Sequence, residues 1–500
     1  MGKRAVAQER RPFFFGTVSN RSSQKPQLNT RAGVANNEIR EASMVDSHLQ
    51  EESGPGLIRG LGLKEATAAN VVEMLGIGPF ITIPFLIAEM GGPHAMLGWF
   101  LGAILAVCDG LVWAELGAAM PGAGGSYIYL REAYNPHKMG KMMSFLFVWM
   151  IFFTAPLSVA TGSVGFAQYL RYLSPDLSDL TIQWIAVGLC LLVTFALYRG
   201  IRTIGRLSFI LMLVAVGTIL WVIVSGVASF KLELLLDIPE GAFSFSSDFF
   251  LGLGGAALIG IYGYGGYNNV CFLGGEVKNP SKNIPFAVLA SIFIVAALYI
   301  FLNTSILGVI PWRDVMQTQH VVSDFMEMIY GPWAAQAITV LILGASFASI
   351  FALLLGYSRI PYAAAKDGRF FSVFSRLHPT KHFPHISLVT LGLLSTVFCF
   401  LDLSSIIQSL IVIQIIVQII GQIVGVTLIR RYRRDIERPF KMWLYPVPSI
   451  VALTLWLLVL FSTGWKIVSL GLAVLALGVG LYMLRARQIK GWPFQSVISQ

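Results

Sequence analysis

Charged residues are scarce in this sequence, and their scarcity excludes a soluble fold. Asp, Glu, Lys and Arg together make up 12% of the 500 residues, whereas about a quarter of the residues in a soluble globular domain are charged. Apolar residues account for 55% of the chain. A soluble chain of this length needs more charged and polar residues to cover its apolar core. The composition therefore predicts a protein that resides in a lipid bilayer.

Cysteine and histidine are also few, and their positions exclude several kinds of site. Cys108, Cys190, Cys271 and Cys399 all lie in apolar stretches, where a free thiol behaves as a small apolar side chain. Neither a disulfide framework nor a zinc site is indicated. The seven histidines lie in polar segments or at the edges of apolar ones. Because no nucleophile, base or metal cluster converges within an apolar stretch, we expect neither an enzyme nor a bound cofactor.

The apolar residues fall into blocks long enough to cross a membrane. A helix rises about 1.5 Å per residue, so about twenty residues span a hydrocarbon core of about 30 Å. Backbone exposed to lipid must satisfy its hydrogen bonds within its own segment, so the blocks must be α-helices. We predict an all-α polytopic membrane protein with about twelve transmembrane helices. The blocks comprise residues 67–90, 95–120, 142–170, 182–197, 204–227, 249–273, 286–309, 333–357, 386–401, 406–429, 445–461 and 467–484.

The basic residues are distributed unevenly between alternate loops. Lys and Arg collect in the loops on the cytoplasmic side of a membrane. If the N-terminus lies inside, only Arg171, Lys231, Arg313 and Lys466 lie outside, which leaves 32 of the 36 basic residues inside. We therefore predict that both termini are cytoplasmic. The net charge of +10 follows from loops that meet anionic lipid headgroups, and nucleic-acid binding is not expected.

The two ends of the chain differ in composition from the apolar blocks. Residues 1–60 are polar and lack the apolar run of a secretory signal peptide. We predict a disordered cytoplasmic tail over 1–60, a transmembrane domain over 61–490 and a short cytoplasmic tail over 491–500. The expected location is the cell membrane. The start of the chain is also rich in arginine and poor in acidic residues, as in a transit peptide, so an organelle membrane is the alternative.

Two of the predicted helices contain clusters of glycine. The first contains Gly76-Ile77-Gly78-Pro79, and the sixth contains the sequence YGYGGYNN at 262–269. Glycine costs a helix about 1 kcal/mol and proline about 3 kcal/mol, so both clusters should unwind their helices near the middle of the bilayer. Irregular backbone persists at that depth only where it is buried in protein or lines a wet cavity. We therefore predict a substrate site at these interruptions.

The spacing of the interrupted helices supports a repeated architecture. They are five helices apart, as expected if helices 1 to 5 and 6 to 10 form two inverted repeats with a central site between the broken pair. The alternative is that the glycines only allow helices to pack closely, for which small residues at a spacing of four are common. Two interruptions at corresponding repeat positions favour the substrate site.

Glu73 is a carboxylate in the middle of a predicted span, three residues before Gly76. Such a group costs about 2.5–3.5 kcal/mol on insertion scales and needs a reason. Three functional interpretations compete: it titrates with a coupling proton, it neutralises a cationic substrate, or it helps to hold a metal cation. The structural alternative is that it pairs with a neighbouring backbone group or with a loop arginine.

Other polar residues within the predicted spans are less specific. Gln414, Gln418 and Gln422 recur every four residues, so they should share one helix face that lines the pathway or packs against neighbouring helices. Ser346 and Ser349 could contribute to a sodium site, although hydroxyls in helices commonly bond to carbonyls of their own helix.

Two carboxylates lie on the second predicted helix. Glu115 is expected to anchor the inner end of the helix bundle. Asp109 receives no assignment.

Four segments resemble the amino acid, polyamine and organocation permease superfamily. They are AELGAAMPGAGGSYIYL at 114–130, the run 264–285 that ends in EVKNPSKNIP, SRIPYAAAKDG at 358–368, and RPF at 438–440. They occur in the family's order between about residues 65 and 485. The segment 262–269 is most similar to the L-type amino acid transporter branch.

This resemblance implies a permease that works by alternating access, with an amino acid held between the broken helices. The substrate carboxylate would meet backbone N–H groups at the start of a half-helix, and its ammonium would meet unpaired carbonyls. Tyr262 matches the aromatic gate over the substrate, and Asn268 lies near that position. The predicted substrate-binding residues are Gly76, Ile77, Gly78, Tyr262, Tyr264, Gly265, Gly266 and Asn268, with Glu73 as the residue for coupling or substrate charge.

The sequence also departs from its relatives in two segments. Helix 204–227 has no lysine near Ala215, where many relatives carry one, and the loop 174–179 has no cysteine. The expected charge carrier is therefore missing, and no disulfide-linked heavy chain is expected. We predict an amino acid or polyamine substrate, contact with membrane lipid, and a proton or sodium co-ion. The alternatives are a polyamine or other organic-cation transporter and a non-coupled, transporter-like receptor.

Overall fold

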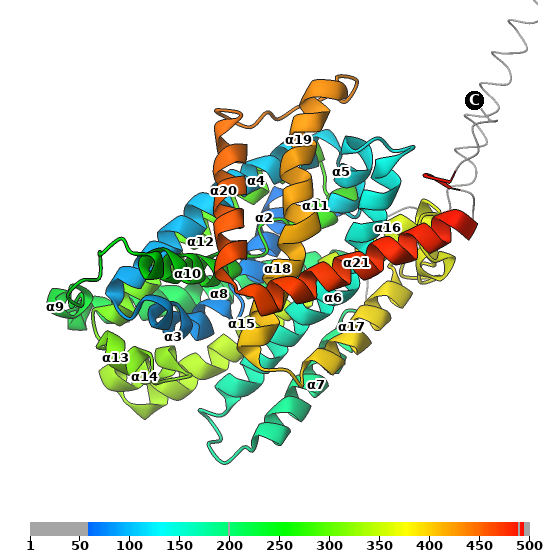
Figure 1. Ribbon diagram of the computed structural model, residues 1–500. Helices are drawn as coiled ribbons and strands as arrows, with labels where there is room; N and C mark the ends of the chain where they lie inside the picture. Colours follow the sequence, from blue (N-terminus) through cyan, green and yellow to red (C-terminus); the bar gives the residue numbers. More distant parts are fainter. Residues whose placement is uncertain (1–58, 199–200, 489–490, 495–500) are drawn as a thin grey trace, which may run out of the picture. The chain divides into compact units, whose positions relative to one another are not determined.

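The computed structural model describes residues 59–198, 201–488 and 491–494 (Figure 1). Residues 1–58 of the predicted N-terminal tail and 495–500 of the predicted C-terminal tail lie outside the described residues. Those described form helices joined by loops, and their strand-like contacts are two isolated bridges, Leu61 with Val277 and Ala123 with Leu273. The all-α prediction is confirmed.

The helices follow the predicted apolar blocks closely. In the first half they are α2 (Leu63–Met74), α3 (Gly78–Met90), η1 (Pro93–Met96), α4 (Leu97–Ala119), α5 (Ser126–Ala133), α6 (Met139–Leu170), α7 (Asp179–Ala196), α8 (Ile201–Ser229) and α9 (Leu232–Leu235). In the middle of the chain they are α10 (Ser247–Tyr264), α11 (Asn269–Phe272), η2 (Gly274–Glu276), α12 (Pro280–Leu307), α13 (Trp312–Val315), α14 (Val321–Tyr330) and α15 (Pro332–Tyr357). The remaining helices are α16 (Arg359–Lys366), η3 (Ser372–Ser375), α17 (His385–Phe398), α18 (Leu403–Gln414), the π-helix η4 (Ile415–Ile419), α19 (Ile420–Tyr432), α20 (Val447–Ser462) and α21 (Trp465–Gln488).

Many of these helices are long and apolar enough to cross a membrane. Within the described residues eight segments meet that condition, and the pair α2 and α3, bent by 44° at its break, would make a ninth. The helices α17 and α20 are apolar but shorter. A polytopic membrane protein is confirmed, and the total of twelve spans remains a prediction.

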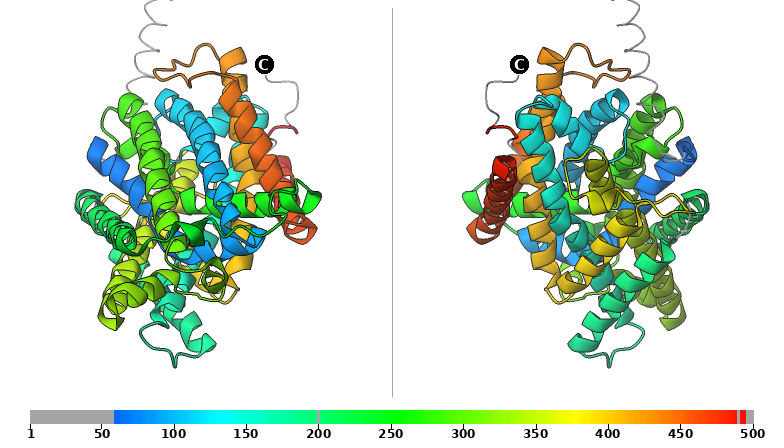
Figure 2. Two further views of the ribbon diagram at one scale, coloured as in Figure 1. Left: turned by 90° about the vertical axis from the view of Figure 1, so that its left-hand side faces the viewer. Right: turned by 90° about the vertical axis from the view of Figure 1, so that its right-hand side faces the viewer.

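The loops on the two predicted sides lie at opposite ends of the helices. Figure 2 shows the loop 433–446 (orange) at one end of the helical unit and the loop 171–178 (teal) at the other. The first follows a helix that ends in Arg430 and Arg431, and it is one of the predicted inside loops. The second is one of the predicted outside loops. These two loops therefore lie at opposite ends, as the count of basic residues requires of them.

Both glycine clusters interrupt their helices. The first break separates α2 from α3 at residues 75–77, and the second separates α10 from α11 at 265–268. Pro79 lies in the first turn of α3, where its missing N–H costs nothing. Gly266 has φ of +116°, a conformation that favours glycine. The predicted breaks are confirmed, although α10 continues through Tyr264 before it ends.

The two breaks lie next to each other. The helix α11 packs against α2, and α10 packs against α3, so each half of one broken helix contacts a half of the other. The long helices α4, α6, α12 and α15 pack against this broken pair. The unwound backbone at 75–77 is therefore buried in protein, as are Gly266 and Tyr267 in the second break, whereas Gly265 is exposed.

Candidate functional site

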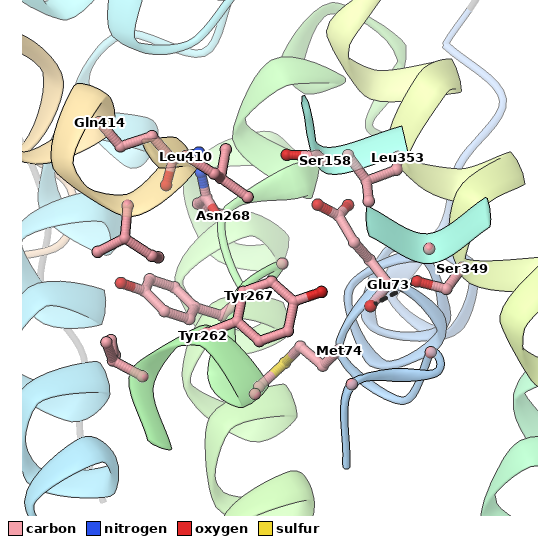
Figure 3. Close-up of a pocket in the computed structure, with 18 of the residues that line it drawn as sticks. Glu73, Met74, Ser158, Tyr262, Tyr267, Asn268, Ser349, Leu353, Leu410 and Gln414 are labelled. Carbon is pink, nitrogen blue, oxygen red and sulfur yellow. Dashed lines mark hydrogen bonds between the residues drawn. The ribbon is translucent and has the colours of Figure 1, made fainter. Parts of the chain in front are cut away.

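A cavity of about 110 Å³ lies between the two breaks (Figure 3). An enclosed space of about 150 Å³ is sufficient for benzene, so the cavity has the scale of a small organic solute. Side chains from α4, α6, α15, α18 and α20 complete its wall. Figure 3 shows that Glu73, Tyr262 and Gln414 reach this space from three different helices. A hollow therefore exists where the glycine clusters predicted one.

The break in the first helix presents backbone N–H groups without intramolecular partners. The N–H groups of Gly76, Ile77 and Gly78 form no hydrogen bond to any described residue, and all three residues line the cavity. Because α3 begins at Gly78, the positive end of its dipole lies at the same place. Free N–H groups at the start of a helix favour an anion.

The break in the sixth helix presents the opposite polarity. The carbonyls of Gly263 and Gly265 accept no hydrogen bond from the described residues, and both residues line the cavity. Gly263 is buried and Gly265 is exposed, and carbonyls that no protein group satisfies at this depth favour a ligand with N–H groups. The cavity thus has donors on one broken helix and acceptors on the other.

The carbonyls at the end of α2 are satisfied by neighbouring helices. Ser349 Oγ on α15 donates to the Glu73 carbonyl at 2.8 Å, shown as a dashed line in Figure 3. Tyr299 on α12 donates its hydroxyl to the Met74 carbonyl. A Cβ on Gly76 would lie 2.4 Å from Ser349 Oγ. Only glycine at this position therefore allows Ser349 to approach the Glu73 carbonyl. The first break is thereby held by two fixed hydroxyls.

The second break is held by Asn70, which the sequence analysis did not identify. This residue is fully buried on α2. Its Nδ2 donates to the Tyr267 carbonyl at 2.6 Å, and its Oδ1 accepts from the Val270 N–H at 2.8 Å. One side chain thus satisfies two backbone groups that the break releases. Asn70 therefore links the first broken helix to the unwound part of the sixth.

Glu73 lies against the second break as well. A Cβ on Gly266 would lie 2.7 Å from Glu73 Cγ, so the bare backbone at Gly266 packs directly on this side chain. The Oε2 atom of Glu73 is buried and has no hydrogen-bond partner among the described residues. The Asn269 side chain lies beside this carboxylate, and the cavity lining among the described residues contains no arginine.

A second carboxylate, Asp109 on α4, also lines the cavity. It is 1% exposed. Its Oδ2 accepts hydrogen bonds from Tyr267 Oη at 2.6 Å and from Trp113 Nε1 at 3.0 Å. Its Oδ1 has no partner among the described residues. The sequence left Asp109 without a role, and the structure places it in the same cavity as Glu73.

Eight of the nine predicted site residues line the cavity, and Tyr264 does not. Its hydroxyl donates to the Trp99 carbonyl at 3.2 Å, and its ring packs against Trp99 and Tyr299. Because α10 continues through Tyr264, that residue is rotated by about 200° from Tyr262 on the helix. Tyr264 therefore faces Trp99 and Tyr299 and does not face the cavity. The eight in the lining are Glu73, Gly76, Ile77, Gly78, Tyr262, Gly265, Gly266 and Asn268.

The glutamine stripe is only partly formed. Gln414 and Gln418 line the cavity, and Gln414 Nε2 donates to Tyr357 Oη at 3.3 Å. Gln422 is buried outside it. The π-helix at Ile415–Ile419 changes the helical register between these residues. Two of the three glutamines therefore line the cavity, and the shared face of all three remains a prediction.

The two serines of α15 bond to other helices. Ser346 Oγ donates to the Gly162 carbonyl on α6 at 3.2 Å, and Ser349 Oγ bonds to α2. The alternative that they bond to carbonyls of their own helix is wrong. Both serines line the cavity. The sodium site that they suggested remains a prediction.

Glu115 joins three segments near one end of the bundle. It accepts from Arg430 Nε at 2.8 Å and from the Met442 N–H at 2.8 Å, and Arg438 Nη1 lies 3.8 Å away. It is 1% exposed. This carboxylate connects α4 to α19 and to the loop before α20, which agrees with the predicted anchor.

Comparison with known proteins connects this geometry to transport. The family described as Amino acid permease matches residues 61–480. The chain is similar to the branched-chain amino acid permease BcaP of Bacillus subtilis (strain 168), with 23% identity over 90% of this chain and 98% of that protein. It is 27% identical to the serine/threonine exchanger SteT of the same organism, over 82% and 92% of the two chains. It is 26% identical to the large neutral amino acids transporter small subunit 2 of Rattus norvegicus, over 91% of this chain and 86% of that protein.

Proposed function

This chain belongs to the amino acid permease family, and from that premise we propose that it holds one amino acid between its two broken helices while carrying it across the membrane by alternating access. The protein is a transporter of amino acids and not an enzyme. The observation that supports the binding mode is the opposed polarity of the two breaks, with free N–H groups on one and free carbonyls on the other. A zwitterion has the complementary pair of charges.

The substrate carboxylate binds at the first break in this proposal. The free N–H groups of Gly76, Ile77 and Gly78 supply donors, and the dipole of α3 adds to their attraction. The three residues lack bulky polar side chains at this point, so backbone can approach the ligand closely. A diamine has no carboxylate to offer these donors. The geometry therefore favours amino acids over polyamines, which remain the second candidate.

The substrate ammonium binds at the second break, to the carbonyls of Gly263 and Gly265. Tyr262 closes the site from one side in our proposal. The position of a Cβ on Gly78 lies 3.6 Å from Tyr262 Cε1, so this ring packs over the carboxylate-binding backbone. A change of its rotamer would open or seal the cavity, which is what an aromatic gate requires.

We place the protein in the cell membrane with both termini in the cytoplasm. The distribution of basic residues supports this orientation. The loops 433–446 and 171–178, which it assigns to opposite sides, lie at opposite ends in Figure 2. An organelle membrane is the competing location, and imaging of a tagged full-length chain in its native cell would decide between them.

Substrate analogues in proteoliposomes test the binding mode. Each amino acid that is taken up is compared with its methyl ester, which lacks the anionic carboxylate, and with its N-acetyl derivative, which lacks the ammonium. We expect both derivatives to compete at least about tenfold more weakly, because each leaves charged or dipolar groups without a partner. Equal competition by the methyl ester would contradict carboxylate binding at Gly76–Gly78.

The same proteoliposomes test the co-ion and the receptor alternative. Proton and sodium gradients are imposed separately, and accumulation above the equilibrium level identifies the coupled ion. Binding without any uptake, in vesicles whose protein is correctly inserted, would favour the transporter-like receptor.

A further inference from the structure

A second pocket, of about 410 Å³, shares no lining residue with the substrate cavity. Pockets of about 300–1,000 Å³ are typical of sites that hold small organic ligands. The segments that form this one are the chain before α2, the loop before α5, α5 itself, η2 and α16. All of them belong to segments that the distribution of basic residues assigns to the cytoplasmic side. The pocket therefore faces the cytoplasm in the proposed orientation.

The lining of this pocket carries more positive than negative charge. It contains Arg59, Arg131 and Lys366 but a single carboxylate, Asp367. Arg131 pairs with Asp367, and its Nε also lies 2.7 Å from Glu132 outside the pocket. Arg59 and Lys366 are exposed and form no ion pair with any described residue. Arg131 and Asp367 therefore compensate each other, and the other two cations are left for a ligand.

Tyr362 adds a buried tyrosine with an unused hydroxyl to the same pocket. It is only 5% exposed, and it lines the pocket from α16. Its hydroxyl forms no hydrogen bond with a described residue, although a buried tyrosine hydroxyl usually finds a partner. Lys366 follows four residues later on α16, so the two side chains lie on one face of that helix. The pocket thus combines two uncompensated cations with a free hydroxyl donor.

We propose that this pocket binds a phosphate monoester at the cytoplasmic face of the protein. Arg59 and Lys366 donate charge-assisted hydrogen bonds to its oxygens, and the Tyr362 hydroxyl donates another. A monoester carries about −1.5 to −2 charges at pH 7, which matches the two uncompensated cations. The phosphate belongs either to a phosphorylated inositol lipid, whose headgroup lies at the cytoplasmic surface of the membrane, or to a soluble compound. The proposal does not depend on the substrate site.

Binding to the purified full-length protein in detergent tests the ligand. The probe is a short-chain phosphatidylinositol bisphosphate, and it is compared with phosphatidylinositol, which has the same ring without the monoester groups. We expect the bisphosphate to bind at least about tenfold more tightly, because it alone completes the charge-assisted hydrogen bonds. Inositol trisphosphate separates the two sources of phosphate. Weaker binding than that of the lipid would support a lipid headgroup, and equal binding would support a soluble phosphate in the same site.

Two variants test the assigned residues, and a third is a matched control. Lys366→Gln should weaken binding of the bisphosphate by about tenfold or more, since it removes a charged donor. Tyr362→Phe should weaken it by about fivefold, because it removes a neutral donor and leaves every charge in place. Lys282→Gln removes an exposed cation of α12 on the same predicted side but outside the pocket, and it should leave binding unchanged. Thermal unfolding of each variant establishes that it is folded.

Three results would overturn the proposal. Equal binding of phosphatidylinositol and its bisphosphate would refute recognition of a phosphate monoester. Equal losses in Lys282→Gln and Lys366→Gln would show that the basic loops attract the lipid in general and that the pocket does not select it. Unchanged binding in folded Lys366→Gln and Tyr362→Phe would remove both residues from the site.

Discussion

Replacement of Asn70 by Ala is the perturbation that most directly tests how the second break is held. The substitution removes a donor to the Tyr267 carbonyl at 2.6 Å and an acceptor for the Val270 N–H at 2.8 Å. Each buried backbone group left unsatisfied costs about 1–3 kcal/mol. The expected loss is therefore about 2–6 kcal/mol. The substitution acts on the unwound segment 265–268. Substrate binding should therefore be lost even under conditions in which the protein is still folded.

The chain offers a matched control for this experiment. Asn303 on α12 is also fully buried, but its Nδ2 donates to the Tyr299 carbonyl of its own helix, at 2.8 Å. Asn303→Ala removes a similar side chain without releasing backbone groups at a break. We expect it to lower stability less than Asn70→Ala and to leave substrate binding detectable.

Purified protein in detergent gives both readouts. Thermal unfolding reports stability, and the increase in unfolding temperature on addition of a transported amino acid reports binding. We expect Asn70→Ala to lose that increase and Asn303→Ala to retain it. If Asn70→Ala were as stable as the wild type and kept its response to substrate, Asn70 would not hold the break and the reasoning would be refuted.

The remaining predictions concern the glycine contact, the anchor and the two tyrosines. Gly266→Ala should abolish uptake while membrane insertion persists, because φ is +116° and the new Cβ would lie 2.7 Å from Glu73 Cγ; normal uptake would contradict the packing of Glu73 on the break. Glu115→Gln should lower the free energy of unfolding by about 3 kcal/mol, since it leaves a buried ion pair with Arg430 incomplete, and thermal unfolding of the purified protein checks this. Tyr264→Phe should keep uptake and cost about 1 kcal/mol of stability for its bond to Trp99, whereas Tyr262→Ala should abolish uptake; equal losses of transport would indicate that both rings face the substrate.

The helical breaks could be predicted from the sequence because their cause is local. Glycine and proline disfavour helix wherever they cluster, so Gly76, Gly78 and Pro79 mark the first break without knowledge of the fold. The exact end of α10 could not be predicted from the sequence. Tyr262 to Tyr264 carry no strong stop signal, and the helix continues to Tyr264 because tertiary packing against Trp99 and Tyr299 holds it there. That extension moved Tyr264 out of the site.

The features that were missed depend on contacts distant in sequence. Asn70 is a lone amide in an apolar run, and its partners lie 197 and 200 residues away. Asp109 belongs to the cavity only because α4 packs against α10. The π-helix at Ile415–Ile419 adds a register change that no regular spacing of glutamines reveals. Single-sequence patterns describe one helix at a time and contain no information on such packing.

The measurement that tests the central claim most directly is an experimental structure of the full-length protein in a lipid nanodisc with a transported amino acid bound. The account predicts substrate density in the cavity, with its carboxylate at the N–H groups of Gly76 to Gly78 and its ammonium at the carbonyls of Gly263 and Gly265. Continuous helical density through both breaks, or a substrate bound away from them, would contradict it.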